Sequence, residues 1–243
     1  MTRRQIIALA VLLLAACTRR KPDVPILTYH SVSSAPDSFA VSPDAFAAQM
    51  DALQRAGFHT VTFHEWLEHE EHGAPLPGKP VILTFDDGYE DAYAAVLPAL
   101  RSRGMRGVFF VVSSLVGADA SHRVVQGDRR YLVWPEVRAL AAAGMEIGSH
   151  GAGHVRLADL PRAQVLEELT RSKERLEAGL GGPIEVLAYP YNSVRRWMVP
   201  LVEKSGYRAA VAGFAHGGAG RFAIYRIGVY RGTTTEELLA QLR

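Results

Sequence analysis

The chain has 243 residues, of which 48% are hydrophobic and 21% are charged, and its formal net charge at pH 7 is +2. This composition is typical of a globular protein and excludes an intrinsically disordered chain. The near balance of charge gives no argument for nucleic acid as a partner. Since Cys17 is the one cysteine, an internal disulfide is excluded.

Residues 1–17 resemble a bacterial lipoprotein signal peptide. Two arginines precede an apolar stretch, residues 6–14, that is too short to cross a bilayer comfortably. Cys17 follows this stretch, where the lipidated cysteine of such a signal becomes the first residue of the mature chain. We therefore expect a lipid anchor at Cys17. The alternative is an ordinary signal peptide or an uncleaved anchor with a cysteine placed there by chance.

A polar segment over residues 18–24 predicts a short tether between the anchor and the folded domain. Thr18 is not the acidic residue associated with retention in an inner membrane. We therefore expect a lipoprotein of the cell envelope, on the outer membrane and facing the periplasm. In a source with a single membrane, the protein would face outward.

From residue 25 onwards, short apolar runs alternate with amphipathic stretches. The expected strands cover residues 25–29, 60–63, 80–85, 107–113, 145–149, 185–189, 208–212 and 224–230. The expected helices cover residues 43–56, 64–71, 92–103, 135–143, 161–180, 194–204 and 235–242. Polar residues 117–130 predict a loop or lid, and residues 213–220 form a glycine-rich loop. Seven or eight units of strand and helix predict an α/β fold, a distorted (β/α)7-8 barrel in a single domain.

Two motifs directly follow expected strands and carry metal-binding side chains. Asp86 and Asp87 come after one apolar strand, and His150 and His154 come after another. The carboxyl ends of parallel strands meet at one end of a barrel, so we expect these side chains to lie together. One carboxylate and two imidazoles make a divalent metal site with an open position. The second carboxylate is then free to act as a base on water that the metal activates.

The sequences around these motifs resemble the polysaccharide deacetylase family (carbohydrate esterase family 4) over most of residues 25–240. Residues 84–88, Thr-Phe-Asp-Asp-Gly, are similar to the first motif of that family. Residues 132–150 are similar to the helix and strand that lead into its second motif. Residues 188–191, Ala-Tyr-Pro-Tyr, resemble its third motif.

The resemblance implies a role for each matched residue. Asp86 would be the catalytic base, and Asp87, His150 and His154 would bind the metal. The backbone N–H of Tyr191 would help to bind the oxyanion. The metal would be zinc, with nickel, cobalt or iron as alternatives.

The chain departs from the family pattern at three places. Gly151 stands where Ser or Thr usually follows the first histidine, and Ala188 stands where an arginine usually orients the base. Arg226 is a candidate replacement for that arginine. The late Leu-x-His motif with the general acid is not found. However, residues 25–32 resemble the strand from which a subgroup supplies this histidine, which implies that His30 is the general acid.

Taken singly, several of these residues have plainer interpretations. The acid pair could cap a helix N-terminus, since Asp stabilises helix starts. His30 alone would more often be a buried structural histidine. The Tyr191 side chain could simply pack beside Pro190. The combination of the acid pair with the histidine pair favours the metal site.

The implied function is metal-dependent removal of acetyl groups from polymeric N-acetylglucosamine, which releases acetate. The subgroup resemblance favours poly-β-1,6-N-acetylglucosamine as the substrate. The alternatives are deacetylation of peptidoglycan or chitooligosaccharides, hydrolysis of a non-sugar amide, and a non-catalytic carbohydrate-binding lipoprotein. Residues 25–243 would form the polysaccharide deacetylase domain. Its partners would be an N-acetylated glycan and, through Cys17, a membrane; the oligomeric state is not predicted.

Overall fold

The computed structural model describes residues 24–213 and 220–242. The lipoprotein signal with Cys17 and residues 18–23 of the tether lie outside the described residues, as do residues 214–219 of the glycine-rich loop. Among the helices within the described ranges, none combines the length and apolarity needed to cross a bilayer.

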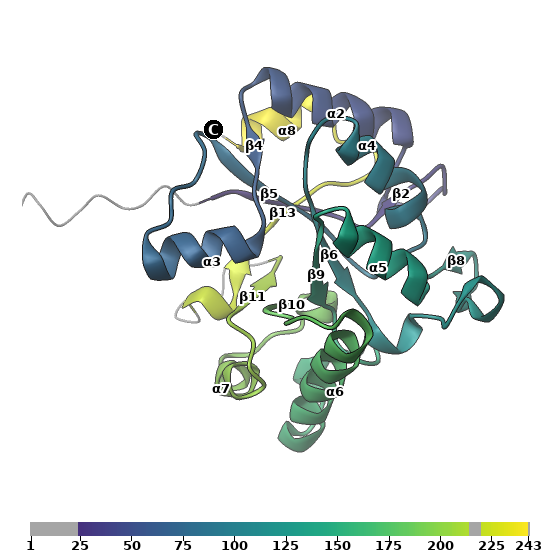
Figure 1. Ribbon diagram of the computed structural model, residues 1–243, viewed down its shortest axis with the longest axis vertical. Helices are drawn as coiled ribbons and strands as arrows, with labels where there is room; N and C mark the ends of the chain where they lie inside the picture. Colours follow the sequence, from purple (N-terminus) through teal and green to yellow (C-terminus); the bar gives the residue numbers. More distant parts are fainter. Residues whose placement is uncertain (1–23, 214–219, 243) are drawn as a thin grey trace, which may run out of the picture.

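Parallel strands form a barrel that is almost closed (Figure 1). The strands are β1 (Ile26–Tyr29), β4 (His59–Thr60), β5 (Pro80–Phe85), β6 (Val108–Val111), β9 (Glu146–Ser149), β10 (Val186–Ala188), β11 (Ala209–Ala212), β12 (Ile224–Tyr225) and β13 (Ile227–Gly228). Their order is β12-β11-β10-β9-β6-β5-β1-β13, with β4 paired to the start of β5. The predicted barrel is therefore confirmed.

One segment closes this barrel. The strands β12 and β13 stand at opposite ends of the strand order, yet Arg226 alone separates them along the chain. The segment pairs first with β11 and then with β1. The expected last strand is thus divided between two neighbours, because it has to bridge them.

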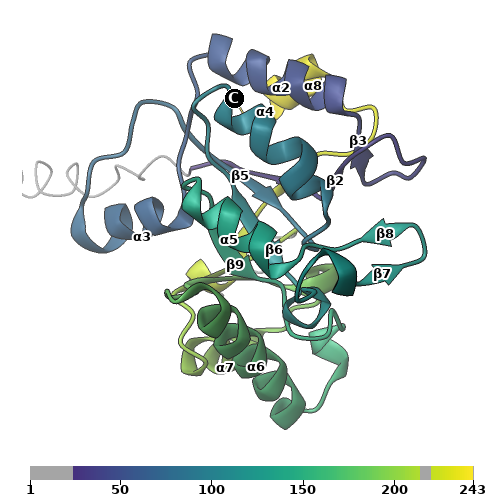
Figure 2. The same cartoon turned by 45° about the vertical axis from the view of Figure 1, so that its right-hand side comes forward.

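Helices cover the outside of the barrel (Figures 1 and 2). They are α2 (Pro43–Arg55), α3 (Phe63–His72), α4 (Leu97–Arg101), α5 (Trp134–Ala142), α6 (Arg162–Leu180), α7 (Val199–Lys204) and α8 (Thr235–Gln241). Short 3-10 turns occur at Ser113–Leu115, Ala120–His122, Leu157–Asp159, Pro190–Asn192, Arg196–Met198 and Gly220–Phe222. The Ser42 hydroxyl accepts a hydrogen bond from Ala45 N and caps α2, as its place before Pro43 predicts.

The expected helix over residues 92–103 begins differently. A π-helical turn, η1 (Ala92–Val96), precedes α4, and Leu97 N donates to Ala92 O. Pro98 explains this turn, because it has no N–H to donate four residues back and its ring crowds that carbonyl.

The expected loop or lid over residues 117–130 contains a small hairpin of β7 (Val125–Gln126) and β8 (Arg129–Arg130) (Figure 2). An ion pair between Arg129 and Asp37 joins this hairpin to the loop between β2 (Ser31–Val32) and β3 (Ala40–Val41).

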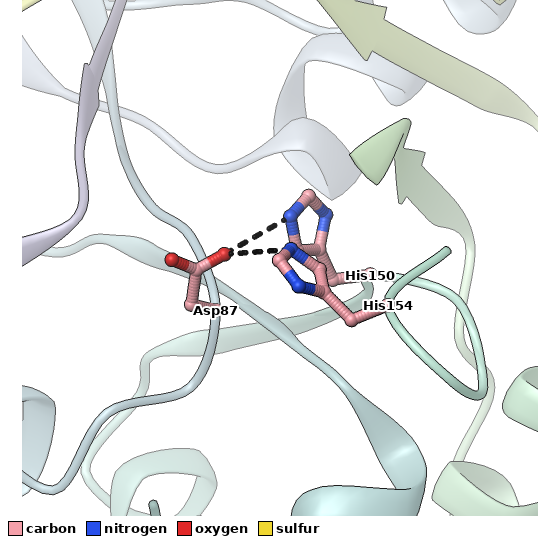
Figure 3. A group of neighbouring side chains, drawn as sticks. All are labelled: Asp87, His150 and His154. Atoms are coloured by element: carbon pink, nitrogen blue, oxygen red, sulfur yellow. Dashed lines mark ion pairs between the residues drawn. The ribbon is translucent and has the colours of Figure 1, made fainter. Parts of the chain in front are cut away.

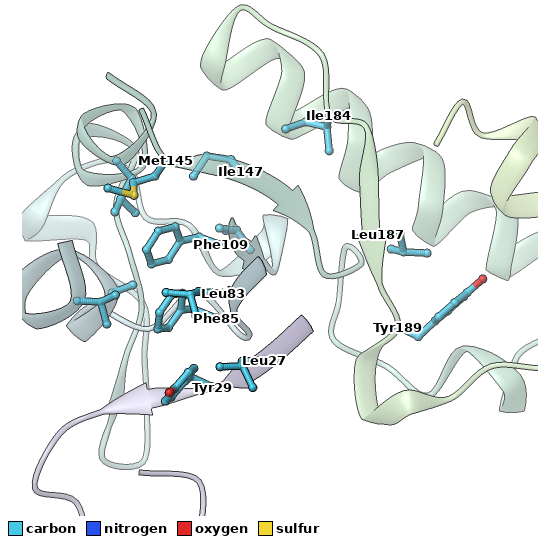
Figure 4. Packing of buried hydrophobic residues seen from close by; sticks show 14 of the residues in the cluster. Leu27, Tyr29, Leu83, Phe85, Phe109, Met145, Ile147, Ile184, Leu187 and Tyr189 are labelled. Carbon is cyan, nitrogen blue, oxygen red and sulfur yellow. The ribbon is translucent and has the colours of Figure 1, made fainter. Parts of the chain in front are cut away.

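Alternate strand residues face opposite sides of the barrel wall. The outer set includes Leu27, Leu83, Phe109 and Leu187, which lie in the core cluster that the helices cover (Figure 4). The inner set forms a second cluster of Ile26, Ile82, Val108, Phe110, Val186, Ala188, Ala209 and Val211. Phe63 and Leu67 of α3 belong to the same inner cluster. They pack at the level where the strands begin, so α3 closes the amino end of the barrel.

This alternation fixes where the polar residues lie. On β1 and β5 the inner positions continue from Ile26 to His30 and from Ile82 to Asp86, in steps of two residues. The same step leads from Ile224, which packs against the inner cluster, to Arg226. The barrel therefore carries its candidate site residues at the carboxyl end, directly above an apolar interior.

Candidate metal centre and active site

Asp87, His150 and His154 converge on one point (Figure 3). Asp87 Oδ1 lies 3.3 Å from His150 Nε2 and 3.2 Å from His154 Nε2. One ligand atom from each residue lies within 4.8 Å of the others, the one such group of His, Cys, Asp or Glu among the described residues. The predicted metal ligands are thus brought together, and their donor set and spacing fit a divalent ion.

Hydrogen bonds orient both imidazoles. His150 Nδ1 lies 2.8 Å from the carbonyl oxygen of Ala188, which can only accept, so the ring hydrogen sits on Nδ1. Its Nε2 faces Asp87 and carries a second hydrogen in the metal-free imidazolium; loss of that hydrogen would free the lone pair for a metal. His154 Nδ1 lies 3.2 Å from the Tyr191 hydroxyl, so its Nε2 is likewise the atom that faces Asp87.

The backbone around this group is strained. Asp87, His154, Tyr191 and Asn192 have φ values of 74°, 53°, 56° and 53°, in the left-handed region that side chains rarely adopt. Such conformations cost free energy and are found where a site demands a particular geometry. Gly151, with φ of 76°, explains the missing Ser or Thr, because glycine adopts this conformation without strain.

Asp86 is buried and held by Arg226. Arg226 Nη1 donates to Asp86 Oδ1 and Nη2 donates to Oδ2, each over 2.7 Å, and the Arg226 side chain is 2% exposed. Nη1 also lies 3.1 Å from Thr84 Oγ1. Position 188 is alanine, and the arginine that pairs with Asp86 comes from the segment that closes the barrel.

Charge keeps both acids ionised. Burial alone would raise the pKa of the Asp86 carboxyl, but the Arg226 and His150 charges outweigh it and lower the pKa. Burial also opposes ionisation of Asp87, yet hydrogen bonds from His150 and His154 hold its pKa well below the usual range. The ionised carboxylate is the form that a general base requires, and Asp86 holds it beside the Asp87–His150–His154 group.

His30 lies at the end of β1 and lines the same cleft as both acids. Within the described part of the chain its buried Nδ1 has no hydrogen-bond partner, and its ring centroid lies 4.7 Å from that of Phe39. Burial lowers the pKa of His30, although the Asp86 and Asp87 carboxylates oppose the shift. The two carboxylates are therefore the groups that favour the charged imidazole, the form a general acid requires.

Above these groups opens a cleft of about 870 Å³. Seven phenylalanine and tyrosine side chains line it: Phe39, Tyr89, Tyr131, Tyr189, Tyr191, Tyr225 and Tyr230. The hairpin contributes Gln126 and Arg129. Of these wall residues, Tyr191 alone was singled out from the sequence, because most of the others lie on separate loops and share no motif.

Comparison with known proteins places this site in a family. The family model described as polysaccharide deacetylase matches residues 73–210, which is more than half of the chain. YxkH of Bacillus subtilis, which carries a provisional polysaccharide deacetylase name, is 28% identical over 88% of this chain and 74% of its own. The poly-β-1,6-N-acetyl-D-glucosamine N-deacetylase of Escherichia coli is 36% identical, but over 40% of this chain and 16% of its own. A Staphylococcus aureus protein of the same name is 21% identical over 74% of this chain and 63% of its own.

Solved structures share the fold. The Streptococcus pyogenes deacetylase PplD, in complex with acetate, superposes with a TM-score of 0.80 at 22% identity, over 90% of this chain and 98% of that one. IcaB from Ammonifex degensii gives a TM-score of 0.79 at 24% identity, over 90% and 96%. With the family model, the relatives and the fold in agreement, the chain belongs to the polysaccharide deacetylase family of enzymes.

Proposed function

We propose that the protein removes acetyl groups from N-acetylglucosamine residues of a polysaccharide, with poly-β-1,6-N-acetylglucosamine as the preferred polymer. One observation carries the proposal: Asp86, paired with Arg226, lies beside the Asp87–His150–His154 group at the floor of an open cleft. The names of the Escherichia coli and Staphylococcus aureus relatives support the choice of linkage.

The proposed chemistry begins with water. A divalent ion held by Asp87, His150 and His154 would lower the pKa of a bound water and polarise the acetyl carbonyl. Asp86 accepts a proton from the attacking water, because Arg226 keeps it ionised and fixes both of its oxygens. The water oxygen then forms the new bond to the acetyl carbon.

The leaving nitrogen needs a proton, since an amide nitrogen does not leave as an anion. The imidazolium form of His30 supplies it as the C–N bond breaks and becomes neutral, while Asp86 holds the proton taken from water, so the charge balances. The Tyr191 N–H donates to the negatively charged oxygen of the tetrahedral intermediate. The products are acetate and a free amino sugar.

The test is acetate release by the metal-loaded full-length chain from β-1,6- and β-1,4-linked N-acetylglucosamine oligomers. We expect faster release from the β-1,6 series and a loss of at least 100-fold in Asp86→Asn, the scale of general-base catalysis. Faster release from the β-1,4 series would reassign the polymer to a chitin- or peptidoglycan-like glycan. No release from either series, with metal bound, would refute the proposal.

We also propose that Cys17 carries a lipid that holds the enzyme on the cell envelope, on the outer membrane where there is one. The support is the apolar stretch that ends at this cysteine. Mass spectrometry of the purified mature chain should show an acylated N-terminal cysteine. Cys17→Ser should shift the protein from the membrane to the soluble fraction, and unchanged fractionation would contradict the anchor.

A further inference from the structure

Exposed aromatic rings gather at the mouth of the cleft. Among the described residues six large hydrophobic side chains are exposed, and four of them line the cleft: Phe39, Tyr191, Tyr225 and Tyr230, with exposed fractions of 45%, 51%, 53% and 46%. Single exposed apolar side chains are ordinary, but a group of them around a cleft marks a binding surface.

Two of these rings form a wall beside His30. The centroids of Phe39 and Tyr230 lie 5.8 Å apart with an interplanar angle of 68°, and the other neighbour of Phe39 is the His30 ring. Phe39 immediately precedes β3 and Tyr230 follows β13, so distant segments build the wall together. No carboxylate or ammonium group takes part in these ring contacts.

Gly228 allows the Tyr230 ring to lie where it does. A Cβ at position 228 would stand 2.4 Å from Tyr230 Oη and 2.6 Å from its Cζ. The ring therefore rests against bare strand backbone. Because Gly228 supports it on one side and Phe39 on the other, the ring has little freedom to lose when a ligand binds.

Tyr191, another exposed aromatic residue of the cleft, is held differently. Tyr191 stacks on the His154 ring at 4.6 Å, and the Arg156 guanidinium lies 4.7 Å from the Tyr191 centroid. Tyr191 is thus tied to a metal ligand, whereas the Phe39–Tyr230 wall touches His30 alone among the proposed catalytic groups. All of these residues line one cleft, so a glycan with its acetamide beside Asp86 and His30 would extend along the Phe39–Tyr230 wall.

We infer that Phe39 and Tyr230 form a platform for the pyranose ring next to the one that is deacetylated, so that the enzyme selects a polymer over a single sugar. The inference rests on the proposed function. A pyranose presents a flat face of C–H groups that packs against an aromatic ring and removes apolar surface from water. A platform at the neighbouring sugar position would bind more tightly those substrates that are long enough to reach it.

The experiment measures kcat/KM for acetate release as a function of oligomer length, with the metal-loaded full-length chain and oligomers of one to six sugars. We expect the wild-type value to rise with length and Tyr230→Ala to lose about fivefold to tenfold of that rise. Gly228→Ala should lose a similar part, because its Cβ displaces the ring while the ring itself is retained. The matched control is Tyr93→Ala, since Tyr93 is also exposed, at 38%, but lies outside the cleft.

A second readout separates this inference from the proposed function. In the Asp86→Asn background, the affinity for the same oligomers should rise with length, and Tyr230→Ala should reduce that rise. If no glycan yields acetate, the proposed function fails, and this binding series alone decides on the platform. Equal losses at every length, or a Tyr230→Ala profile that matches Tyr93→Ala, would overturn the platform.

Discussion

At the scale of single residues, the site depends on a buried ion pair between Asp86 and Arg226. Two charges removed from water are tolerated only when their geometry is good and their remaining atoms are bonded. Here both carboxylate oxygens are bonded to the guanidinium and Thr84 Oγ1 lies close to Nη1, whereas the buried Arg226 Nε has no partner among the described residues. The sequence showed alanine at position 188 in place of the usual arginine and offered Arg226 as a candidate replacement; the structure adds that Arg226 lies on the inner side of the last strand and pairs with Asp86.

We predict that Arg226→Met costs about 3–5 kcal/mol of unfolding free energy, because it leaves the buried Asp86 carboxylate without a partner. It should also raise the pKa of Asp86, since the cation favours the charged form, and move the acid limb of the kcat/KM profile to higher pH. Arg226→Lys keeps the charge but not the two-pronged contact, so its effects should be smaller.

Urea unfolding and pH–rate profiles check both effects. Arg171→Met serves as the control, because Arg171 forms an exposed pair with Glu167 whose loss should cost at most about 1 kcal/mol. An acid limb that stays in place in Arg226→Met would contradict the assignment of Asp86 as the base.

At the scale of elements, the strands that end in site residues could be predicted from the sequence, but two irregular elements near them could not. The strand over residues 80–85 was predicted with its bounds, because an apolar run before two acids leaves little choice. The π-helical turn before α4 and the hairpin over residues 125–130 were missed. Each depends on a local exception, Pro98 in one and the Gly127 turn in the other, that periodicity does not reveal.

The contact between β9 and α3 makes part of the folding stability depend on pH. Glu146, the first residue of β9, accepts from Phe63 N at 2.6 Å and from His64 N at 3.3 Å at the start of α3. Burial raises the pKa of Glu146 to about 7 although these hydrogen bonds oppose it. The folded chain thus keeps a proton that the unfolded chain releases near pH 4.5. Stability from this group is therefore full at low pH and is lost as the pH rises through about 7.

We predict that Glu146→Gln, which cannot ionise, gains stability relative to the wild type between pH 5 and pH 8, by about 2 kcal/mol. Urea unfolding at pH 5 and pH 8 gives the unfolding free energy of each protein, and the prediction concerns how far the variant's advantage over the wild type grows between the two. Glu203→Gln, at an exposed position, should show no such change. A difference that is the same at both pH values would show that Glu146 does not titrate in this range.

At the scale of the whole molecule, the barrel brings together loops that the chain separates widely. Asp87 follows β5, and both histidines follow β9, so a metal bound there would tie these two loops together. The sequence predicted this meeting because parallel strands end on one side. It did not predict the cleft walls, since Phe39 and Tyr230 meet only after the last strand has closed the barrel.

We predict that Zn²⁺ at a hundredfold excess over its Kd raises the unfolding free energy by about 2.7 kcal/mol, because it binds the folded chain alone. A chelator should reverse the gain. Thermal unfolding with and without metal measures it, and His154→Ala should abolish most of it. His122→Ala removes an exposed histidine from outside the metal group and should keep the gain in full. Stabilisation that persists in His154→Ala would place the metal elsewhere.

The closing segment, residues 224–228, is synthesised after the catalytic and metal-binding residues of the site. Asp86, Asp87, His150 and His154 all precede Arg226 in the sequence, so a nascent chain holds these four residues before it holds the partner of Asp86. The guanidinium arrives on the same segment that seals the barrel between β11 and β1. A chain that stops before this segment would therefore lack both the closing strands of the barrel and the partner of Asp86.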